Sequence, residues 1–201
     1  MQKIGVYGGS FDPIHLGHLL LAESAREELG LDQVIFVPAK RSPLKPNSSV
    51  AGDEHRWKML LLAIEDNRHF VGSRVELDRK SPSYTVLTME SFAQAYTKAE
   101  LWLILGEDTL IDFDHWYQYQ RLLQITKIAV GARPGFNVNG KKGVLPQQIR
   151  NYAERFEFFS NPLFAVSSRE IRERLKNGSS VSYLLLPKVK EYIFKHRLYQ
   201  Y

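Results

Sequence analysis

The chain has 201 residues, of which 44% are hydrophobic and 24% charged, a composition typical of a globular protein with a substantial core. The absence of cysteine excludes disulfides, thiolate metal sites and a thiol nucleophile. No apolar run approaches the roughly 18 residues of a membrane span, and an apolar segment begins close to Met1, so we expect a cytoplasmic protein without a signal peptide or membrane contact. The formal net charge of +5 suits an anionic partner, such as a nucleotide, a nucleic acid or a phosphorylated metabolite.

Segments rich in Val, Ile and aromatic residues alternate with helix-length segments along most of the chain. Strands are predicted at 3–8, 33–38, 70–77, 101–106 and 126–132. Helical patterns are predicted between them, from Leu19 to Leu29 with Gly30 as the stop, from Trp57 to Ile64, and from Leu87 to Tyr96. The predicted strands are continuously apolar, as in a sheet that helices cover on both faces. This pattern predicts an α/β fold with a doubly wound, Rossmann-like parallel sheet.

The last part of the chain has a different pattern, with two helices expected in succession within 167–201. No repeat, low-complexity tract or long linker interrupts the sequence, so we predict a single domain over 1–201 that ends in this helical segment. Two basic loops, 38–49 and 133–143, are rich in Pro, Gly or Asn. They are either lids over a site or ordinary surface turns.

The segment "GGSFDPIHLGH", Gly8 to His18, directly follows the first predicted strand. In doubly wound sheets, ligands bind beyond the carboxyl ends of the strands, near the point where the strand order reverses. Gly8 and Gly9 allow the backbone to approach a ligand closely, and Pro13 constrains the turn. The first N–H groups of a helix that begins near Leu16 carry positive partial charge and should face the same crevice. The segment therefore predicts an anion site.

Two histidines three residues apart, His15 and His18, open this helix. At that spacing both can lie on one side of it and donate hydrogen bonds to phosphate oxygens. The segment matches neither the P-loop pattern nor the G-x-G-x-x-G pattern. Two alternatives stay open, a zinc site and a capping or core role. Zinc is disfavoured because a catalytic site needs a third protein ligand, and the next histidine, His55, lies far along the chain.

A second phosphate clamp is predicted near the C-terminus, in "VSSREIRERLKNG". Ser167 and Glu170 fit the S-x-x-E capping box that starts a helix, and Gly178 is placed to end it. Ser168 and Arg172 then share one helix face, where a hydroxyl, helix-start N–H groups and a guanidinium together suit a phosphate. The alternative is an ordinary capped surface helix.

A third group of candidates surrounds the strand predicted at 101–106. Asp108 follows this strand and could accept hydrogen bonds from ribose hydroxyls. Trp116 offers a flat face to a planar heterocycle, although it could equally be the apolar anchor of its helix. In "SPSYTVLTM", Ser83 is expected to cap a helix with Thr85 in its first turn, near the same edge of the sheet.

Together these motifs resemble those of a nucleotidyltransferase superfamily. His15-Leu16-Gly17-His18 is similar to its H-x-G-H motif, and "SSREIR" to its I-S-S-T-x-I-R motif, with Arg169 where a small hydroxyl residue is commoner. The resemblance implies in-line attack on the α-phosphorus of a nucleoside triphosphate and release of pyrophosphate without a covalent intermediate. The histidines would brace the triphosphate in the transition state.

Further segments, in order, resemble the bacterial nicotinate-nucleotide adenylyltransferase family: "SPLK", "HRWKML", "PSYT", "GED", "WY" and "ARP". This resemblance implies transfer of AMP from ATP to nicotinate mononucleotide, giving deamido-NAD and pyrophosphate in NAD biosynthesis, with Mg²⁺ accompanying ATP. The implied catalytic residues are His15, His18, Lys45 and Arg172. ATP and its phosphates would lie along Gly8, Gly9, Ser10, Phe11, Gly17, Ser167 and Ser168. The nicotinate nucleotide would meet Thr85, Asp108, Trp116, Tyr117 and Arg133, and no metal site built from protein side chains is expected.

Other functions remain open at this stage. The same chemistry could use nicotinamide mononucleotide or phosphopantetheine as acceptor, although "HWYQ" and the chain length favour a pyridine nucleotide. A nucleotide-binding regulator would have no need of His15, His18 and Arg172 together. A nucleic-acid-binding protein is supported only by the net charge and the two basic loops. The sequence does not decide whether the chain forms a homo-oligomer.

Overall fold

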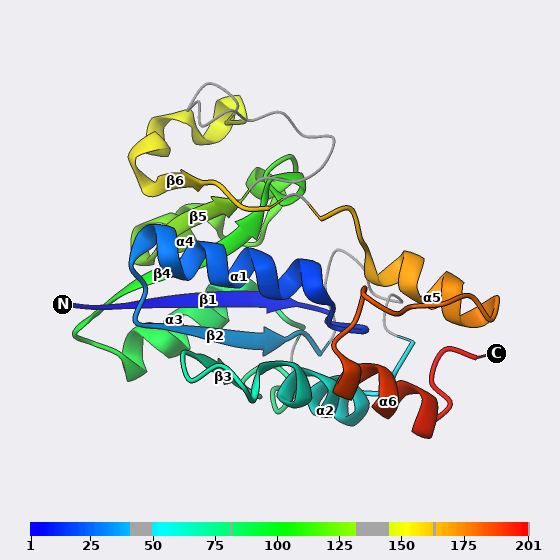
Figure 1. Ribbon diagram of the computed structural model, residues 1–201. Helices are drawn as coiled ribbons and strands as arrows, with labels where there is room; N and C mark the ends of the chain where they lie inside the picture. Colours follow the sequence, from blue (N-terminus) through cyan, green and yellow to red (C-terminus); the bar gives the residue numbers. More distant parts are fainter. Residues whose placement is uncertain (41–49, 81, 132–144, 163, 201) are drawn as a thin grey trace.

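Six parallel strands form one sheet (Figure 1) in the computed structural model, which describes residues 1–40, 50–80, 82–131, 145–162 and 164–200. The strands are β1 (Gln2–Gly9), β2 (Gln33–Pro38), β3 (Phe70–Gly72), β4 (Ala99–Gly106), β5 (Lys127–Gly131) and β6 (Phe156–Phe159). Their order is β3-β2-β1-β4-β5-β6, and every neighbouring pair is parallel. The predicted doubly wound α/β sheet is confirmed.

The strand order reverses between β1 and β4. From β1 the chain moves outward through β2 to β3, then returns to the other side of β1 and moves outward again through β4, β5 and β6. β1 ends at Gly9 and β4 ends at Gly106, so their carboxyl ends lie side by side at this switch point. A crevice outside such a point is where open α/β sheets bind ligands.

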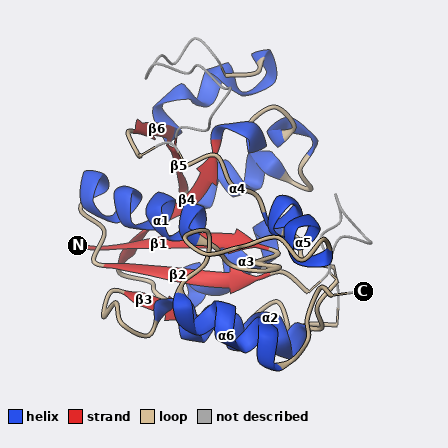
Figure 2. Cartoon of the chain, turned by 45° about the vertical axis from the view of Figure 1, so that its right-hand side comes forward, coloured by secondary structure: helices blue, strands red, loops and turns tan. Residues whose placement is uncertain are grey.

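Helices cover both faces of the sheet (Figures 1 and 2). They are α1 (Leu16–Leu29), α2 (Asp53–Ile64), α3 (Thr85–Ala95), α4 (Tyr119–Ile125), α5 (Ser168–Lys176) and α6 (Pro187–Lys195), with 3-10 helices η1 (Glu107–Thr109), η2 (Phe113–His115) and η4 (Gln147–Arg155). The helices α1, α2, α5 and α6 contribute to one apolar cluster. A second apolar cluster holds side chains of α3, α4 and η4.

The continuous apolar strands follow from this double coverage. Successive side chains of a strand point to opposite faces of a sheet. In β2, Val34 and Phe36 belong to the first cluster, whereas Ile35 and Val37 belong to the second. Each of these four side chains is almost completely buried, so neither face of the strand has room for a polar residue.

The predicted starts and stops of two helices are confirmed. α1 begins at Leu16 and ends before Gly30, whose φ of 61° is a left-handed conformation that glycine adopts without steric cost. In α5, the hydroxyl of the N-cap residue Ser167 accepts a hydrogen bond from the Glu170 N–H at 3.1 Å. Gly178 follows the end of α5, with a φ of 68°.

Two expectations about elements were wrong, and one strand was not predicted. The strand predicted at 70–77 stops at Gly72, because the chain then turns and the N–H of Asp78 donates back to the carbonyl of Arg74. The strand β6 was not predicted, since four residues at a sheet edge are too few for a clear pattern. Ser83 does not cap α3: Tyr84 is the N-cap residue, and Ser83 Oγ accepts from the N–H of Lys40 at 3.0 Å.

Among the described residues, no helix combines the length and the apolar composition that crossing a membrane requires.

Candidate active site

Side chains from two helices hold the carbonyl groups of the loop between β1 and α1. Arg56 of α2 donates to the Ser10 carbonyl oxygen at 2.7 Å. From α5, Arg172 donates to the carbonyl oxygen of Asp12 at 2.7 Å, and Ser168 Oγ donates to that of Pro13 at 2.9 Å. In both views α5 accordingly lies at the carboxyl end of β1 (Figures 1 and 2). The two predicted phosphate motifs therefore meet in space, and Ser168 and Arg172 share a face as expected.

This anchoring orients the backbone of the loop. In a trans peptide the C=O and N–H bonds point in opposite directions. Because Arg56 holds the Ser10 carbonyl, the following N–H, that of Phe11, is directed to the other side of the loop. The Phe11 ring itself is completely buried and packs edge-on against His18, with ring centroids 5.1 Å apart. Phe11 as a whole is completely buried, so its ring packs the loop, and its predicted contact with a nucleotide stays a prediction.

The two histidines of the H-x-G-H motif form a stacked pair. The ring centroids of His15 and His18 lie 3.7 Å apart, with 27° between the ring planes. The backbone N–H of His15 donates to Nδ1 of His18 at 3.2 Å. Because Nδ1 accepts this bond, neutral His18 carries its proton on Nε2, which makes that atom a donor. His15 is the N-cap residue of α1 and is 3% exposed, which is the position that the capping alternative predicts for it.

Gly17 lies against the His15 ring. A Cβ atom at this position would lie 3.1 Å from Val166 Cγ1 and 3.2 Å from both Cε1 and Nδ1 of His15. Contacts this short would push the imidazole aside. The packing of the histidine pair therefore favours glycine between the two histidines.

The helix start offers fewer N–H groups than the sequence suggested. The Leu16 N–H donates to the Leu184 carbonyl oxygen at 3.1 Å, and the His18 N–H to that of His15 at 3.0 Å. The expectation that the first-turn N–H groups as a set face the crevice was therefore wrong. The segment before α6 folds back onto the start of α1 and occupies the first of them.

Asp12, inside the first motif, is a residue that the sequence analysis overlooked. Its side chain is completely buried, and its carboxylate accepts the N–H of Val50 at 2.7 Å and the N–H of Ala51 at 3.2 Å. The hydroxyl of Tyr199 donates to the same carboxylate. Arg56, also completely buried, was overlooked as well. The available signal was a charged residue placed between apolar ones, in "SFDPI" and "HRWKML".

The remaining residues predicted for ATP lie around the same loop. Gly8 is exposed, and Gly9 and Ser10 are partly exposed, at the end of β1. Ser167 lies beside Ser168 and serves as the α5 cap. Asp108, predicted for the nucleotide sugar, is exposed in η1 immediately after β4, at the neighbouring strand end. Both sets therefore line the switch point.

The residues predicted for the acceptor come from α3 and the segment after η1. Thr85 is the first residue of α3, and the ring of its N-cap residue Tyr84 lies 4.5 Å from that of Tyr117, which is 51% exposed. Trp116 is half-buried and lies on Phe113 of the second cluster, with ring centroids 5.2 Å apart. Its position fits the apolar-anchor alternative, and stacking on a ligand stays a prediction. Buried Trp116 Nε1 has no hydrogen-bond partner among the described residues.

Lys45 and Arg133, predicted to meet phosphates, lie outside the described residues. The Arg172 side chain is 23% exposed. Within the described part of the chain, its guanidinium donates one hydrogen bond, from the nitrogen that binds the Asp12 carbonyl. The other nitrogens of the Arg172 guanidinium are thus available to an anion at the carboxyl end of β1. In the same part of the chain, no group of three or more His, Asp or Glu residues is arranged to hold a metal ion.

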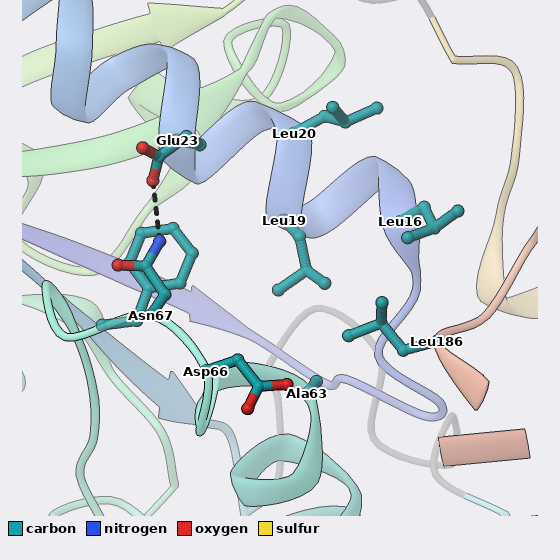
Figure 3. A pocket seen from close by; sticks show the side chains of 9 residues that line it. Leu16, Leu19, Leu20, Glu23, Ala63, Asp66, Asn67 and Leu186 are labelled. Carbon is teal, nitrogen blue, oxygen red and sulfur yellow. Dashed lines mark hydrogen bonds between the residues drawn. The ribbon is translucent and has the colours of Figure 1, made fainter. Parts of the chain in front are cut away.

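A groove of about 320 Å³ lies outside this loop, between α1, the end of α2 and the start of α6 (Figure 3). Its lining is apolar apart from Glu23, Asp66 and Asn67, and Asn67 donates to Glu23 at 2.9 Å. Two carboxylates and no cationic lining residue make this groove unsuitable for a triphosphate. The groove is therefore not a candidate for the nucleotide site, and the prediction of a site at the switch point stays a prediction.

Comparison with known proteins agrees with this geometry. The family model described as cytidylyltransferase-like matches residues 6–174. Curated relatives from Moorella thermoacetica and Dictyoglomus thermophilum are 40% and 38% identical to the chain, each over 98% of it and over 92% and 100% of their own length. A relative from Lachnoclostridium phytofermentans is 36% identical over 99% of this chain and all of its own. All three carry the name "Probable nicotinate-nucleotide adenylyltransferase".

Solved structures share the fold. Plasmodium falciparum nicotinic acid mononucleotide adenylyltransferase complexed with NaAD superposes with a TM-score of 0.80 at 19% identity, covering 99% of this chain and 98% of that one. A structure from Vibrio parahaemolyticus has a TM-score of 0.68 at 20% identity, with coverage of 100% and 96%. On the evidence of the relatives' identity over the full chain, this protein belongs to the nicotinate-nucleotide adenylyltransferase family, within the cytidylyltransferase-like proteins.

Proposed function

We propose that the protein transfers AMP from ATP to nicotinate mononucleotide and so produces nicotinate adenine dinucleotide (deamido-NAD) and pyrophosphate in NAD biosynthesis. The observation that carries this proposal is the meeting of His15, His18, Ser168 and Arg172 around one loop at the switch point of the sheet. The family membership, established over the whole chain, supports the same reaction.

The chemistry needs hydrogen-bond donors rather than a protein nucleophile. The acceptor phosphate attacks the α-phosphorus in line and pyrophosphate leaves, so negative charge moves onto the bridging and leaving oxygens. We propose that His18 Nε2 and the outer nitrogens of Arg172 donate to these oxygens, a role supported by the bonds that orient His18 and anchor Arg172 at this loop. Donors fixed in advance stabilise such charge more than mobile water does. Lys45 and Arg133 are proposed to add positive charge.

Acceptor recognition is proposed for the side of the crevice formed by Thr85, Trp116 and Tyr117, with Asp108 binding the nucleotide sugar. The Tyr84–Tyr117 ring contact brings the start of α3 against the segment after β4. Donors at a helix start suit a carboxylate better than an amide, and a pocket with polar groups matched to its ligand discriminates strongly. We therefore propose a preference for nicotinate over nicotinamide mononucleotide.

Mg²⁺ is proposed to enter with ATP, its ligands being mostly phosphate oxygens and water. The buried carboxylate of Asp12 is not suited to bind it, because backbone N–H groups and the Tyr199 hydroxyl already occupy both oxygens. We propose that the reaction takes place in the cytoplasm, where ATP is available.

The test is identification of the product. The protein is incubated with ATP, Mg²⁺ and nicotinate mononucleotide, and the mixture is analysed by chromatography and mass spectrometry. The proposal predicts a dinucleotide with the mass of deamido-NAD, formed in equal amount to pyrophosphate and abolished by excess chelator. Pyrophosphate without the dinucleotide, or no turnover at all, would reject it.

A further inference from the structure

The C-terminus reaches back to the catalytic loop through one tyrosine. Tyr199 Oη donates a hydrogen bond to Asp12 Oδ1 at 2.5 Å, across 187 positions of sequence. Tyr199 as a residue is 5% exposed and Asp12 is completely buried. A hydrogen bond to a buried carboxylate is among the stronger ones in proteins, and removing its donor leaves the carboxylate with one hydrogen bond fewer in a site that water does not reach.

The chain makes an unusual turn to place this side chain. After α6, Arg197 and Tyr199 adopt φ angles of 49° and 64°, in the left-handed region that side chains other than glycine rarely occupy. Such conformations persist only where surrounding contacts determine them. Here Leu198 is buried in the first apolar cluster, and its N–H donates to the Ile193 carbonyl at 3.0 Å. The ordered turn fixes where the phenol lies.

The hydroxyl of Tyr199 stays a proton donor. Burial, reinforced by the charge of Asp12, raises the pKa of Tyr199 well above its ordinary value. The other donors to the Asp12 carboxylate, the N–H groups of Val50 and Ala51, belong to the segment that leads into α2. Asp12 thus joins the catalytic loop to α2 and to the C-terminus at a single point.

Asp12 also determines where Arg172 lies. The same guanidinium nitrogen of Arg172 that donates to the Asp12 carbonyl at 2.7 Å lies 3.9 Å from its carboxylate. A shift of the Asp12 side chain or backbone therefore moves the anchored end of Arg172. Because His15 follows only three residues later as the N-cap of α1, the same shift reaches the histidine pair.

We propose that Tyr199 is a positioning residue for ATP: through Asp12 it holds Arg172 and the start of α1 in the geometry that binds the triphosphate. Tyr199 lies beyond residues 6–174, the part of the chain that the family model matches. The proposal rests on the adenylyl transfer proposed above. It adds a requirement for the C-terminal turn that neither phosphate motif contains.

The test replaces Tyr199 by Phe, which removes only the hydroxyl. We expect the KM for ATP to rise about tenfold and kcat to fall, with the KM for nicotinate mononucleotide unchanged within about twofold. Loss of folded protein alone lowers the apparent kcat and moves neither KM. The matched control is Tyr192→Phe, which removes a hydroxyl from the same C-terminal segment, where it contacts His55 Nδ1 at 3.0 Å. This control should keep both KM values.

A double-mutant cycle tests the route through Asp12. If Tyr199 acts through this carboxylate, Tyr199→Phe should change the KM for ATP by less than about twofold when introduced into Asp12→Asn. If the two substitutions instead raise the KM for ATP independently, so that their effects multiply, Tyr199 does not act through Asp12. A wild-type KM for ATP in Tyr199→Phe would overturn the proposal.

Variants with low turnover can be compared by ATP binding, measured as the shift in the thermal unfolding midpoint when ATP is added without acceptor. ATP should raise the midpoint of wild type and Tyr192→Phe more than that of Tyr199→Phe. Equal ATP-induced shifts would also overturn the proposal. Turnover by wild type separates this outcome from failure of the proposed function.

Discussion

The imidazole of His18 receives the backbone N–H of His15 on Nδ1 and stacks on the His15 ring with 3.7 Å between centroids. The bond fixes the neutral tautomer of His18, and the stacking fixes its plane. The donor on Nε2 is therefore oriented before any ligand arrives. Pre-orientation of this kind is what a transition-state contact requires.

His18→Ala should lower kcat about a hundredfold or more, since removal of one pre-oriented donor to a developing charge has effects of that order. The variant should remain folded, because His18 is only partly buried. Steady-state pyrophosphate release measures the effect. The control is His69→Ala, because His69 lies at the amino end of β2, away from the strand ends that hold His18. This variant should keep wild-type turnover. Wild-type turnover in His18→Ala would remove His18 from the mechanism.

Gly17→Ala should lower kcat by about tenfold or more, because the added methyl group displaces the His15 ring that it would contact at 3.2 Å. The control is Gly52→Ala, where no heavy atom lies within 4 Å of the added Cβ. The same assay, with circular dichroism to compare folding, separates the two variants. Equal kcat in both would show that the position of His15 does not limit the reaction.

Trp116→Ala should raise the KM for the nicotinate nucleotide about tenfold, the order of effect that loss of one ring stack has. The KM for ATP should not change. The variant will also lose some stability, because Trp116 packs on Phe113. The control is Trp57→Ala, which removes a tryptophan from the other face of the sheet and should lower stability without changing the KM for the nicotinate nucleotide. An unchanged acceptor KM in Trp116→Ala would leave this side chain with the core role only.

The pH dependence of stability should reveal the buried carboxyl of Glu76. Burial raises the pKa of Glu76 above its ordinary value of 4.5, although hydrogen bonds from Thr88 and Ser83 oppose the shift. A raised pKa in the folded state means that the contribution of Glu76 to stability is complete below pH 4.5 and is lost as pH rises through the folded-state value. Glu76→Gln cannot ionise and should gain stability relative to wild type as pH rises from about 4.5 towards neutrality.

Urea unfolding of wild type and Glu76→Gln over this pH range checks the sign. Glu54→Gln serves as the opposite case, because the hydrogen bond from Arg74 lowers the pKa of Glu54. Ionised Glu54 stabilises the folded wild-type protein above pH 4.5, and this contribution is lost as pH falls through the lowered pKa. Glu54→Gln lacks the contribution, so its stability relative to wild type should fall as pH rises. Parallel curves for Glu76→Gln and wild type would contradict the buried-carboxyl interpretation.

The parts of the fold and site that could be predicted are those in which neighbouring residues determine the outcome. Gly8 to His18 combines strand end, turn and helix start within eleven residues, and Ser167 with Glu170 determines where α5 begins. The continuous apolar strands revealed coverage on both faces. In these cases the physical cause, a cap, a turn or a packed face, lies within a few residues of its effect.

The parts that could not be predicted depend on contacts between distant segments. The Tyr199 hydroxyl reaches Asp12 only because α6 packs against α2 and the chain then turns through two left-handed residues. The Leu184 carbonyl takes the first N–H of α1 for a similar reason. A four-residue edge strand such as β6 is fixed by its pairing with β5, and its own sequence is too short to specify it.

Adenylyl transfer to nicotinate mononucleotide can be measured as pyrophosphate release from ATP and Mg²⁺, with nicotinate and nicotinamide mononucleotides as separate acceptors. We expect a ratio of kcat/KM values on the order of a hundredfold or more in favour of nicotinate, as is typical where a pocket pairs a carboxylate with buried donors. Equal use of the two acceptors would contradict the acceptor assignment, and no release with either would contradict the reaction itself.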